Sequence, residues 1–250
     1  MSTRDRLDQM RTATIEQLAM LPKPWRRRLP VDPVLELPSQ APDSAVATAA
    51  YERAEEVSSP ALLGHCMRTW LFGELAAAVD GIDRDQELLY VACMLHDLGL
   101  TEAHTCVDDR ARCFAVEGAF AAEDFLSARG WPAERTEAVT EAISLHLNVR
   151  VPPDRHGAEA HLVNVGAAID VAGRGLPRIP RPRVDEVLSR HPRGDIAAEL
   201  IEALKVQVAA RPDARLTLMW RLGFRRYIEK NPLNTRESGP PATTGVSRTS

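Results

Sequence analysis

The segment YVACMLHDLGL, residues 90–100, places a histidine and an aspartate side by side in an otherwise apolar run. Because His96 and Asp97 follow this run without a polar break, we expect both at the buried end of a core helix that Gly99 caps. Burying an unpartnered imidazole beside an ionised carboxylate is costly, whereas a bound cation satisfies both groups. The pair therefore indicates a metal site, although such a pair also arises by chance in a chain with seven histidines.

Three more polar residues stand in apolar helical surroundings. His65 lies in the segment LLGHCMRTWLFGELAAAV, where its neighbours at helical spacing are small or apolar. Asp170 lies in the last turn of a helix that ends at Gly173, where the helix dipole disfavours a carboxylate. His146 ends the apolar face of another helix, and alone it would be a satisfied core residue more often than not. His65 and Asp170 therefore each need a partner.

Four of these side chains could meet at one cation if three helices converge: His65, His96, Asp97 and Asp170. Two imidazoles and two carboxylates form a mixed nitrogen and oxygen donor set, which suits zinc, iron or manganese better than magnesium or calcium. His161 precedes Asp170 by nine residues, half a helical turn out of phase, so we exclude it as a ligand. His104 lies in a polar loop and is expected at the rim of the site.

The elements that position these residues are predicted to be helices. From residue 44 to about residue 230 the chain is rich in Ala, Leu and Glu without strand-like alternation, which indicates an all-α fold. Ser59 and Pro60 form an N-cap and N1 pair for a helix that runs to about residue 79. Asp83 and Gln86 form a capping box for the next helix. Further helices are expected at residues 117–129, 132–146, 157–171, 184–189, 195–209 and 213–230.

The predicted domain organisation has three parts. Residues 1–45 are rich in proline and form an N-terminal arm, whose Trp25 and Leu35 can pack onto the domain. Residues 46–232 form the helical domain. Residues 233–250, rich in Ser, Thr, Gly and Pro towards the end, form a disordered tail.

Charge and composition exclude several classes of protein. A net charge of −4 and a pI near 6.0 argue against a dedicated nucleic-acid or anionic-membrane surface. No run approaches the length of a membrane helix, and the N-terminus lacks a signal-peptide pattern, so we expect a cytoplasmic protein with no membrane partner. The expected partner is a small-molecule substrate. The oligomeric state stays open, with a homo-oligomer as one option.

The order of the four candidate ligands resembles the H…HD…D pattern of the HD-domain superfamily of metal-dependent hydrolases, over roughly residues 50–190. Within it the chain is most similar to the cyanamide hydratase-like group, through the segments GHCMRTWLFG, MLHDLGLTEA, FAVEGAFAAEDFL, AISLHLN and VNVGAAIDVAG. In that group Asn usually precedes the first histidine and Glu follows the Phe that matches Phe114, whereas this chain has Gly64 and Ala115. These departures bear on the substrate more than on the metal.

The resemblance implies an HD-domain helical bundle, with a metal site between core helices, that adds water to a small cyanamide-like or nitrile-like substrate. It implies one divalent transition metal, with Zn²⁺ as the first choice and Fe²⁺ or Mn²⁺ as alternatives, that activates water and polarises the substrate. His146 is the candidate for proton transfer or substrate orientation. Thr101 and Glu117 are candidates for hydrogen bonds to substrate or water, and Glu117 can replace the carboxylate missing at Ala115.

Three alternative functions remain open at this point. A phosphohydrolase needs a basic side chain at the site, and Arg68, one turn after His65, is the only one obviously placed. A di-iron oxygenase of the same fold needs extra histidines after the HD pair, for which His104 and His146 are the candidates. A non-catalytic helical module would hold a structural metal in a closed coordination sphere.

Overall fold

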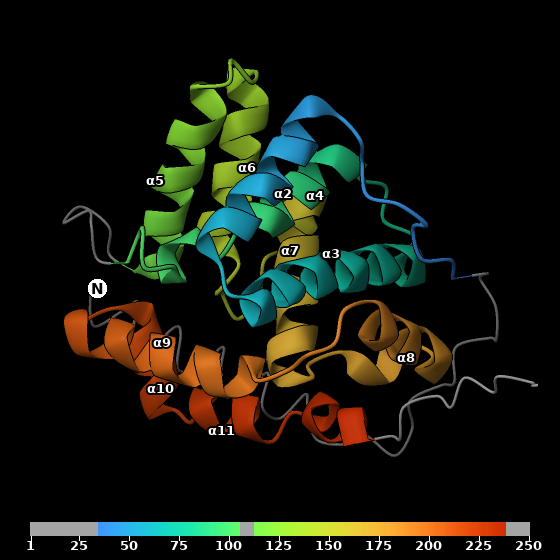
Figure 1. Cartoon of the computed structure of the whole chain (residues 1–250), viewed down its shortest axis with the longest axis vertical. Helices are drawn as coiled ribbons and strands as arrows, with labels where there is room; N and C mark the ends of the chain where they lie inside the picture. Colours follow the sequence, from blue (N-terminus) through green and yellow to red (C-terminus); the bar gives the residue numbers. More distant parts are fainter. Residues whose placement is uncertain (1–34, 106–112, 239–250) are drawn as a thin grey trace, which may run out of the picture.

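The computed structural model describes residues 35–105 and 113–238, which form ten α-helices and three short 3₁₀ helices but no strand (Figure 1). The all-α prediction is confirmed. The α-helices are α2 Ala45–Val57, α3 Pro60–Asp80, α4 Gln86–Leu95, α5 Phe114–Ser127, α6 Ala133–Leu145, α7 Pro153–Ala172, α8 Arg181–Arg190, α9 Ile196–Ala210, α10 Arg215–Arg221 and α11 Phe224–Glu229. The 3₁₀ helices are η1 Leu98–Leu100, η2 Leu176–Arg178 and η3 Pro232–Ser238. In these two ranges, no helix has both the length and the apolar character that crossing a bilayer requires.

Local capping fixes the two ends of α3, the helix that carries His65. The Ser59 hydroxyl accepts a hydrogen bond from the Leu62 amide at 3.0 Å, and Pro60 occupies the first turn. At the other end Gly81 takes the left-handed conformation and terminates the helix after Asp80. The predicted start of α3 is confirmed, and its end lies one residue beyond the predicted position.

Asp85, not Asp83, caps α4. Its carboxylate accepts a hydrogen bond from the Leu88 amide at 2.9 Å. The backbone of Asp85 has the extended conformation that is typical of an N-cap. The predicted capping box between Asp83 and Gln86 is wrong because Gln86 is itself the first residue of α4, which leaves Asp83 too early in the chain.

The C-terminal end of α4 also differs from the prediction. The helix stops at Leu95, and the chain turns through His96 and Asp97 into η1. Gly99 lies inside η1 and is not a helix cap; a Cβ atom here would overlap the carbonyl oxygen of Phe114 at the start of α5. This glycine therefore serves close packing, and Asp97 is released from the helical register of α4.

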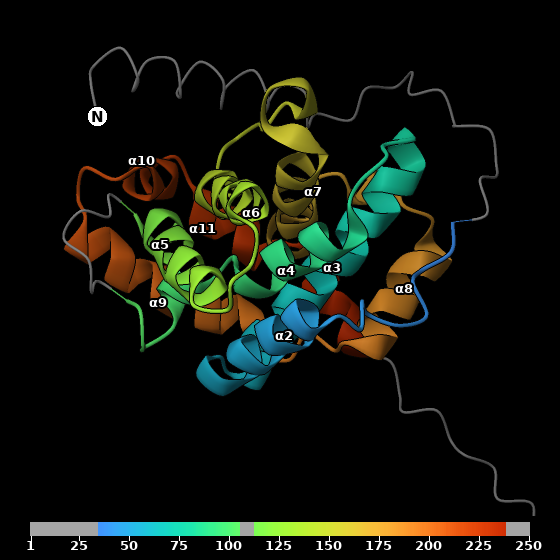
Figure 2. The same cartoon turned by 90° about the horizontal axis from the view of Figure 1, so that it is seen from above.

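The core is built around the crossing of α3 and α7, which make the most extensive contact of any two helices described (Figures 1 and 2). Two glycines bring their backbones together: Gly166 on α7 faces the carbonyl group of Thr69, and Gly73 on α3 faces that of Leu162. α4 and α6 pack against α7, α5 pairs with α6, and α2 covers α4. This arrangement sets the N-terminal part of α3, which carries His65, beside the end of α4.

A second, smaller apolar core joins α9, α10 and α11 to the start of α5, through Phe114, Leu204 and Ile228 among others. In Figure 1 these three helices lie below the main bundle, on the side away from the tips of α5 and α6. The single helix predicted at residues 213–230 is wrong, because Gly223, with a φ of +94°, separates α10 from α11. The other predicted helices after residue 113 overlap α5 to α9, with ends that differ by one to four residues.

Both ends of the described chain pack on the domain. Leu35 is buried in the main core, as predicted, whereas Trp25 lies outside the described residues. Residues 233–238, assigned to a disordered tail by their sequence, form most of η3 instead, and Leu233 is completely buried. The remainder of the predicted tail lies outside the described residues.

The contact between α3 and α7 makes Gly166 intolerant of a side chain. We expect Gly166→Ala to lower the free energy of unfolding by about 3 kcal/mol, because the added methyl group would meet backbone atoms that cannot move independently. Gly130→Ala is the control: nothing lies within 4 Å of its Cβ position, and only the left-handed backbone opposes it, at about 1 kcal/mol. Urea denaturation measures both, and equal losses would contradict the steric explanation.

Candidate metal centre

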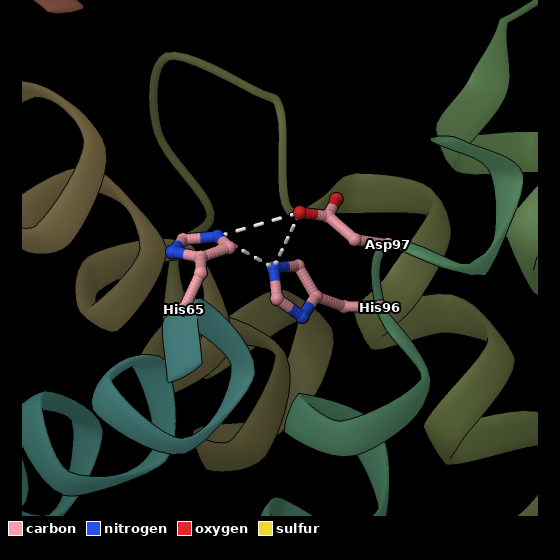
Figure 3. Close-up of side chains that lie close together, drawn as sticks. All are labelled: His65, His96 and Asp97. Atoms are coloured by element: carbon pink, nitrogen blue, oxygen red, sulfur yellow. Dashed lines mark hydrogen bonds and ion pairs between the residues drawn. The ribbon is translucent and has the colours of Figure 1, made fainter. Parts of the chain in front are cut away.

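Three buried side chains converge where the N-terminal part of α3 meets the end of α4 (Figure 3). We call His65, His96 and Asp97 the ligand trio. The two Nε2 atoms lie 3.2 Å apart, and each lies 3.3 Å from the same carboxylate oxygen, Oδ2 of Asp97. Each of these three residues offers one ligand atom, and within residues 35–105 and 113–238 they are the group of potential metal ligands in which all of these atoms lie within 4.8 Å of one another. The predicted meeting of both histidines with Asp97 is therefore seen in the structure.

Hydrogen bonds at the opposite ring nitrogen fix which atom each imidazole presents. Nδ1 of His96 lies 2.7 Å from the carbonyl oxygen of Cys93, and Nδ1 of His146 lies 2.7 Å from that of Ile143. A carbonyl oxygen only accepts, so Nδ1 carries the proton in both rings and the neutral ring keeps its lone pair on Nε2. In His65, Nδ1 lies 2.7 Å from a carboxylate oxygen of Asp170, which sets the same arrangement. Each Nε2 is thus available as a ligand or a proton acceptor.

Asp170 does not join the ligand trio as the sequence predicted. Its Oδ2 accepts the hydrogen bond from His65, while its Oδ1 accepts from Arg68 Nε at 2.8 Å and from Arg193 Nη1 at 2.6 Å. The carboxylate was expected to need a cation, and two buried guanidinium groups meet that need. Asp170 therefore lies behind His65 and orients its ring, the position that carboxylates often take next to a metal-binding histidine.

Burial and neighbouring charges shift the pKa values of the site. Burial lowers the pKa of His96 to about 4, and it also lowers that of His146. Burial opposes the positive charge of His65 as well, but hydrogen bonds to Asp170 and Asp97 outweigh it and raise the pKa of that ring. Burial would raise the pKa of Asp97, yet the charge of His96 and the hydrogen bond with His65 hold it well below its usual range. His96 and His146 are therefore neutral at pH 7, and Asp97 is ionised.

This donor set fits a divalent transition metal. Two imidazole nitrogen atoms and an ionised oxygen lie close to one another in a buried position, and their lone pairs repel unless a cation or a proton lies between them. Nε2 of His146 adds a fourth donor nearby, 3.5 Å from the second carboxylate oxygen of Asp97. The residues that would hold the ion are thus His65, His96 and Asp97, with His146 adjacent.

The other predicted site residues are used elsewhere in the structure. Arg68 is buried, and besides Asp170 it binds the backbone carbonyl oxygens of residues 191 and 192. The Thr101 hydroxyl donates to the carbonyl oxygen of Leu98 at 2.7 Å, and Glu117 pairs with Arg211 at 2.5 Å. None of the three lines the cavity beside the ligand trio.

Two further histidines lie apart from the ligand trio. His104 contacts Arg53, with 2.9 Å between Nε2 and the guanidinium Nη2. His161 contacts the carbonyl oxygen of Val151 at 2.8 Å through Nδ1, consistent with its exclusion as a ligand.

A cavity of about 160 Å³ adjoins the ligand trio and His146. Sequence reasoning missed its polar lining residues Asn148, Asn164 and Arg174, which lie on and around α7. Asn164 donates to the carbonyl oxygens of residues 146 and 148 at 2.7 Å each, so it fixes the turn that carries His146. The sequence did contain a signal for Asn164: it is a polar residue six positions before Asp170 in VNVGAAIDVAG, on a largely apolar helix.

Comparison with known protein families matches residues 62–209, more than half of the chain, to the HD domain. The chain belongs to the HD-domain family. This family comprises metal-dependent hydrolases, in agreement with the position of the ligand trio inside the matched region.

Two curated relatives come from Saccharomyces cerevisiae, strain ATCC 204508 / S288c, and are named cyanamide hydratase DDI2 and cyanamide hydratase DDI3. The chain is 32% identical to each over 114 residues, which is 43% of this chain and 48% of the relative. The match thus spans about half the length of the curated relatives. It supports the predicted likeness to the cyanamide hydratase-like group.

Removing one member of the ligand trio should abolish metal binding. We expect His96→Ala and Asp97→Ala to lose stoichiometric divalent metal, because each removes one of three converging donors, and to lower thermal stability, because the remaining polar groups stay buried without partners. His161→Ala is the matched control and should keep its metal. Plasma emission spectroscopy of the purified variants measures the content; one metal ion per chain in His96→Ala would overturn the assignment.

Asp170→Asn separates an orienting role from ligation. If Asp170 only orients His65, zinc affinity should fall about 10- to 100-fold while stoichiometric binding persists at saturating metal. Unfolding free energy should fall by about 3 kcal/mol, because two buried arginines lose their counter-charge. Asp185→Asn, in an exposed pair with Arg181, is the control. Complete loss of zinc from a folded Asp170→Asn protein, judged by circular dichroism, would make Asp170 a ligand.

Proposed function

We propose that this protein is a metal-dependent hydratase that adds water to a small cyanamide-like or nitrile-like substrate. The observation that carries this proposal is the ligand trio lying directly beside a cavity, with His146 adding a third imidazole to the same lining. The names of the two yeast relatives support the substrate class. Residues that bind a metal for structure alone would not need a cavity at the metal.

Zn²⁺ is the proposed metal, with Fe²⁺ and Mn²⁺ as alternatives, because two imidazoles and one carboxylate suit these ions. When bound, such an ion lowers the pKa of coordinated water towards 7 and polarises a substrate atom. The protein contributes the fixed orientation of the donors, since Cys93 and Asp170 hold the two imidazole rings from behind.

His146 is proposed to move the protons of the reaction. Its Nδ1 is bound to the Ile143 carbonyl oxygen, so its Nε2 is the atom that accepts a proton from water and returns one to the substrate nitrogen. Burial lowers the pKa of this ring, which keeps it neutral and able to accept a proton at pH 7. The hydration needs this transfer because the attacking water loses a proton while the nitrile nitrogen gains one.

The alternative functions receive less support. A phosphohydrolase needs a cationic group for the transferring phosphate, but Arg68 is engaged by Asp170 and two backbone carbonyl oxygens behind the site, and Arg174, which lines the cavity, donates to the carbonyl oxygen of Val149. A di-iron oxygenase needs a second set of ligands, yet His104 contacts Arg53 and does not line the cavity.

His146→Ala should separate metal content from turnover. Because the ligand trio is intact, we expect about one metal per chain to remain, while kcat falls by about 10²- to 10⁴-fold through loss of the proton carrier. His156→Ala, a half-exposed histidine paired with Glu141, is the control for loss of an imidazole. Metal loss in step with activity would instead make His146 a ligand.

A direct assay tests the proposed function. The zinc-loaded protein is incubated with cyanamide, with small nitriles and with p-nitrophenyl phosphate, and urea, amide and phosphate are measured. We expect saturable hydration of cyanamide or a nitrile that His96→Ala abolishes. Phosphate release without hydration would contradict the proposal and favour the phosphohydrolase.

A further inference from the structure

The cavity beside the ligand trio is larger and more apolar than cyanamide requires. Its volume is about 160 Å³, several times the roughly 30 Å³ that one water molecule occupies in the liquid. Cyanamide has three heavy atoms and polar groups at both ends, so it would leave most of this space to water. A cavity of about 150 Å³ lined by leucine, isoleucine and phenylalanine holds benzene. The volume here therefore matches a substituent of the size of an aromatic ring.

The two sides of the cavity differ in chemistry. α3, the end of α4 and the turn after α6 supply the imidazoles and the carboxylate. The helices α9, α10 and α11, which lie below these elements in Figure 1, supply apolar walls. These walls include Leu200, Leu204, Met219 and Phe224. A substrate that spans the cavity thus needs one reactive polar end and one apolar end.

Besides the ligand trio and His146, the polar residues of the lining are Asn148, Asn164, Arg174 and Tyr227, and the first three already bind the protein itself. Asn164 donates to two backbone carbonyl oxygens, and the Asn148 side-chain oxygen accepts from Arg215. Arg174 donates to the carbonyl oxygen of Val149 at 2.6 Å. These bonds hold the lining in place, so recognition of the substituent falls to the apolar walls. Displacing poorly ordered water from such walls by an apolar group increases affinity.

We propose that the substrate is a nitrile whose carbon carries an apolar substituent about the size of a benzene ring, with α9 to α11 as the specificity wall. This inference rests on the proposed hydratase function. In the reaction, the oxygen of one water forms two bonds to the nitrile carbon, the two carbon–nitrogen π bonds and both O–H bonds of the water break, and both protons end on the nitrogen. The product is a primary amide, and nothing is oxidised or reduced.

Ala168 offers a way to fill the cavity from the central helix. It lies on α7 and lines the cavity, and alanine to leucine is well tolerated by helix propensity. We expect Ala168→Leu to lower the ratio of kcat/KM for benzonitrile to that for cyanamide by at least about tenfold, since a single methylene in an apolar pocket is worth about 10- to 200-fold. Ala209→Leu, exposed on α9 and outside the cavity, should leave both values unchanged.

A second variant enlarges the cavity instead of filling it, so the test does not depend on the folding of Ala168→Leu alone. Met219 is half-buried in the outer wall, and Met219→Ala enlarges the cavity without emptying the core. It should improve kcat/KM for 2-naphthonitrile relative to benzonitrile by about tenfold. An unchanged ratio in both folded variants would overturn the assignment of the specificity wall.

Binding measured without turnover distinguishes failure of this inference from failure of the hydratase proposal. Calorimetric titration of the full chain with benzonitrile should show saturable binding that Ala168→Leu weakens at least about tenfold and Ala209→Leu does not. If no compound is hydrated but this pattern holds, the hydratase proposal fails and the apolar cavity stands as a ligand site. If cyanamide is hydrated but benzonitrile neither binds nor reacts, the hydratase proposal stands and this inference is wrong.

Discussion

The mutual approach of two imidazole nitrogens and one carboxylate oxygen, 3.2–3.3 Å apart and shielded from water, is the constraint on which the site depends. Such a cluster is unfavourable unless positive charge lies within it. The fold must therefore hold the rings against their own repulsion. It does so through the backbone carbonyl of Cys93 and the carboxylate of Asp170, and through the close crossing of α3 and α7 at Gly166.

Asp170 extends this constraint into the C-terminal part of the domain. Arg193 binds both its carboxylate and its backbone oxygen, and also contacts Asn234 at 3.0 Å. Asn231 donates to the same backbone oxygen of Asp170 at 2.6 Å. The buried carboxylate of Asp170, which orients His65, is thus neutralised partly by Arg193, which follows α8. Asn231 and Asn234 connect the segment around η3 to the same group of hydrogen bonds.

The separation of the main apolar core from the smaller apolar clusters around α9 to α11 gives the site its asymmetry. The main core carries the polar groups proposed to do the chemistry, and its close packing leaves them little freedom to move. The smaller core of α9 to α11 contributes walls to the cavity without contributing to the ligand trio. Substitutions in the smaller core can therefore change the shape of the cavity while leaving the metal donors in place.

The sequence by itself determined the helical class, the start of α3 and the choice of His65, His96 and Asp97 as candidate ligands. These features are local: a cap is made by neighbouring residues, and a polar pair in an apolar run is visible without coordinates. The end of α4 was misjudged because Gly99 is needed for contact with Phe114, which lies in another segment.

Only the tertiary structure decided what Asp170, Arg68 and Glu117 do. A buried carboxylate needs positive charge, but the sequence cannot say whether a metal ion or an arginine will supply it. Arg193, which follows Asp170 by 23 residues, reaches it only because the chain folds back after α8. Glu117 likewise meets Arg211 across the fold instead of a substrate. Pairing between distant charges depends on how the helices pack, and that packing is what the pattern of residues along the chain leaves undetermined.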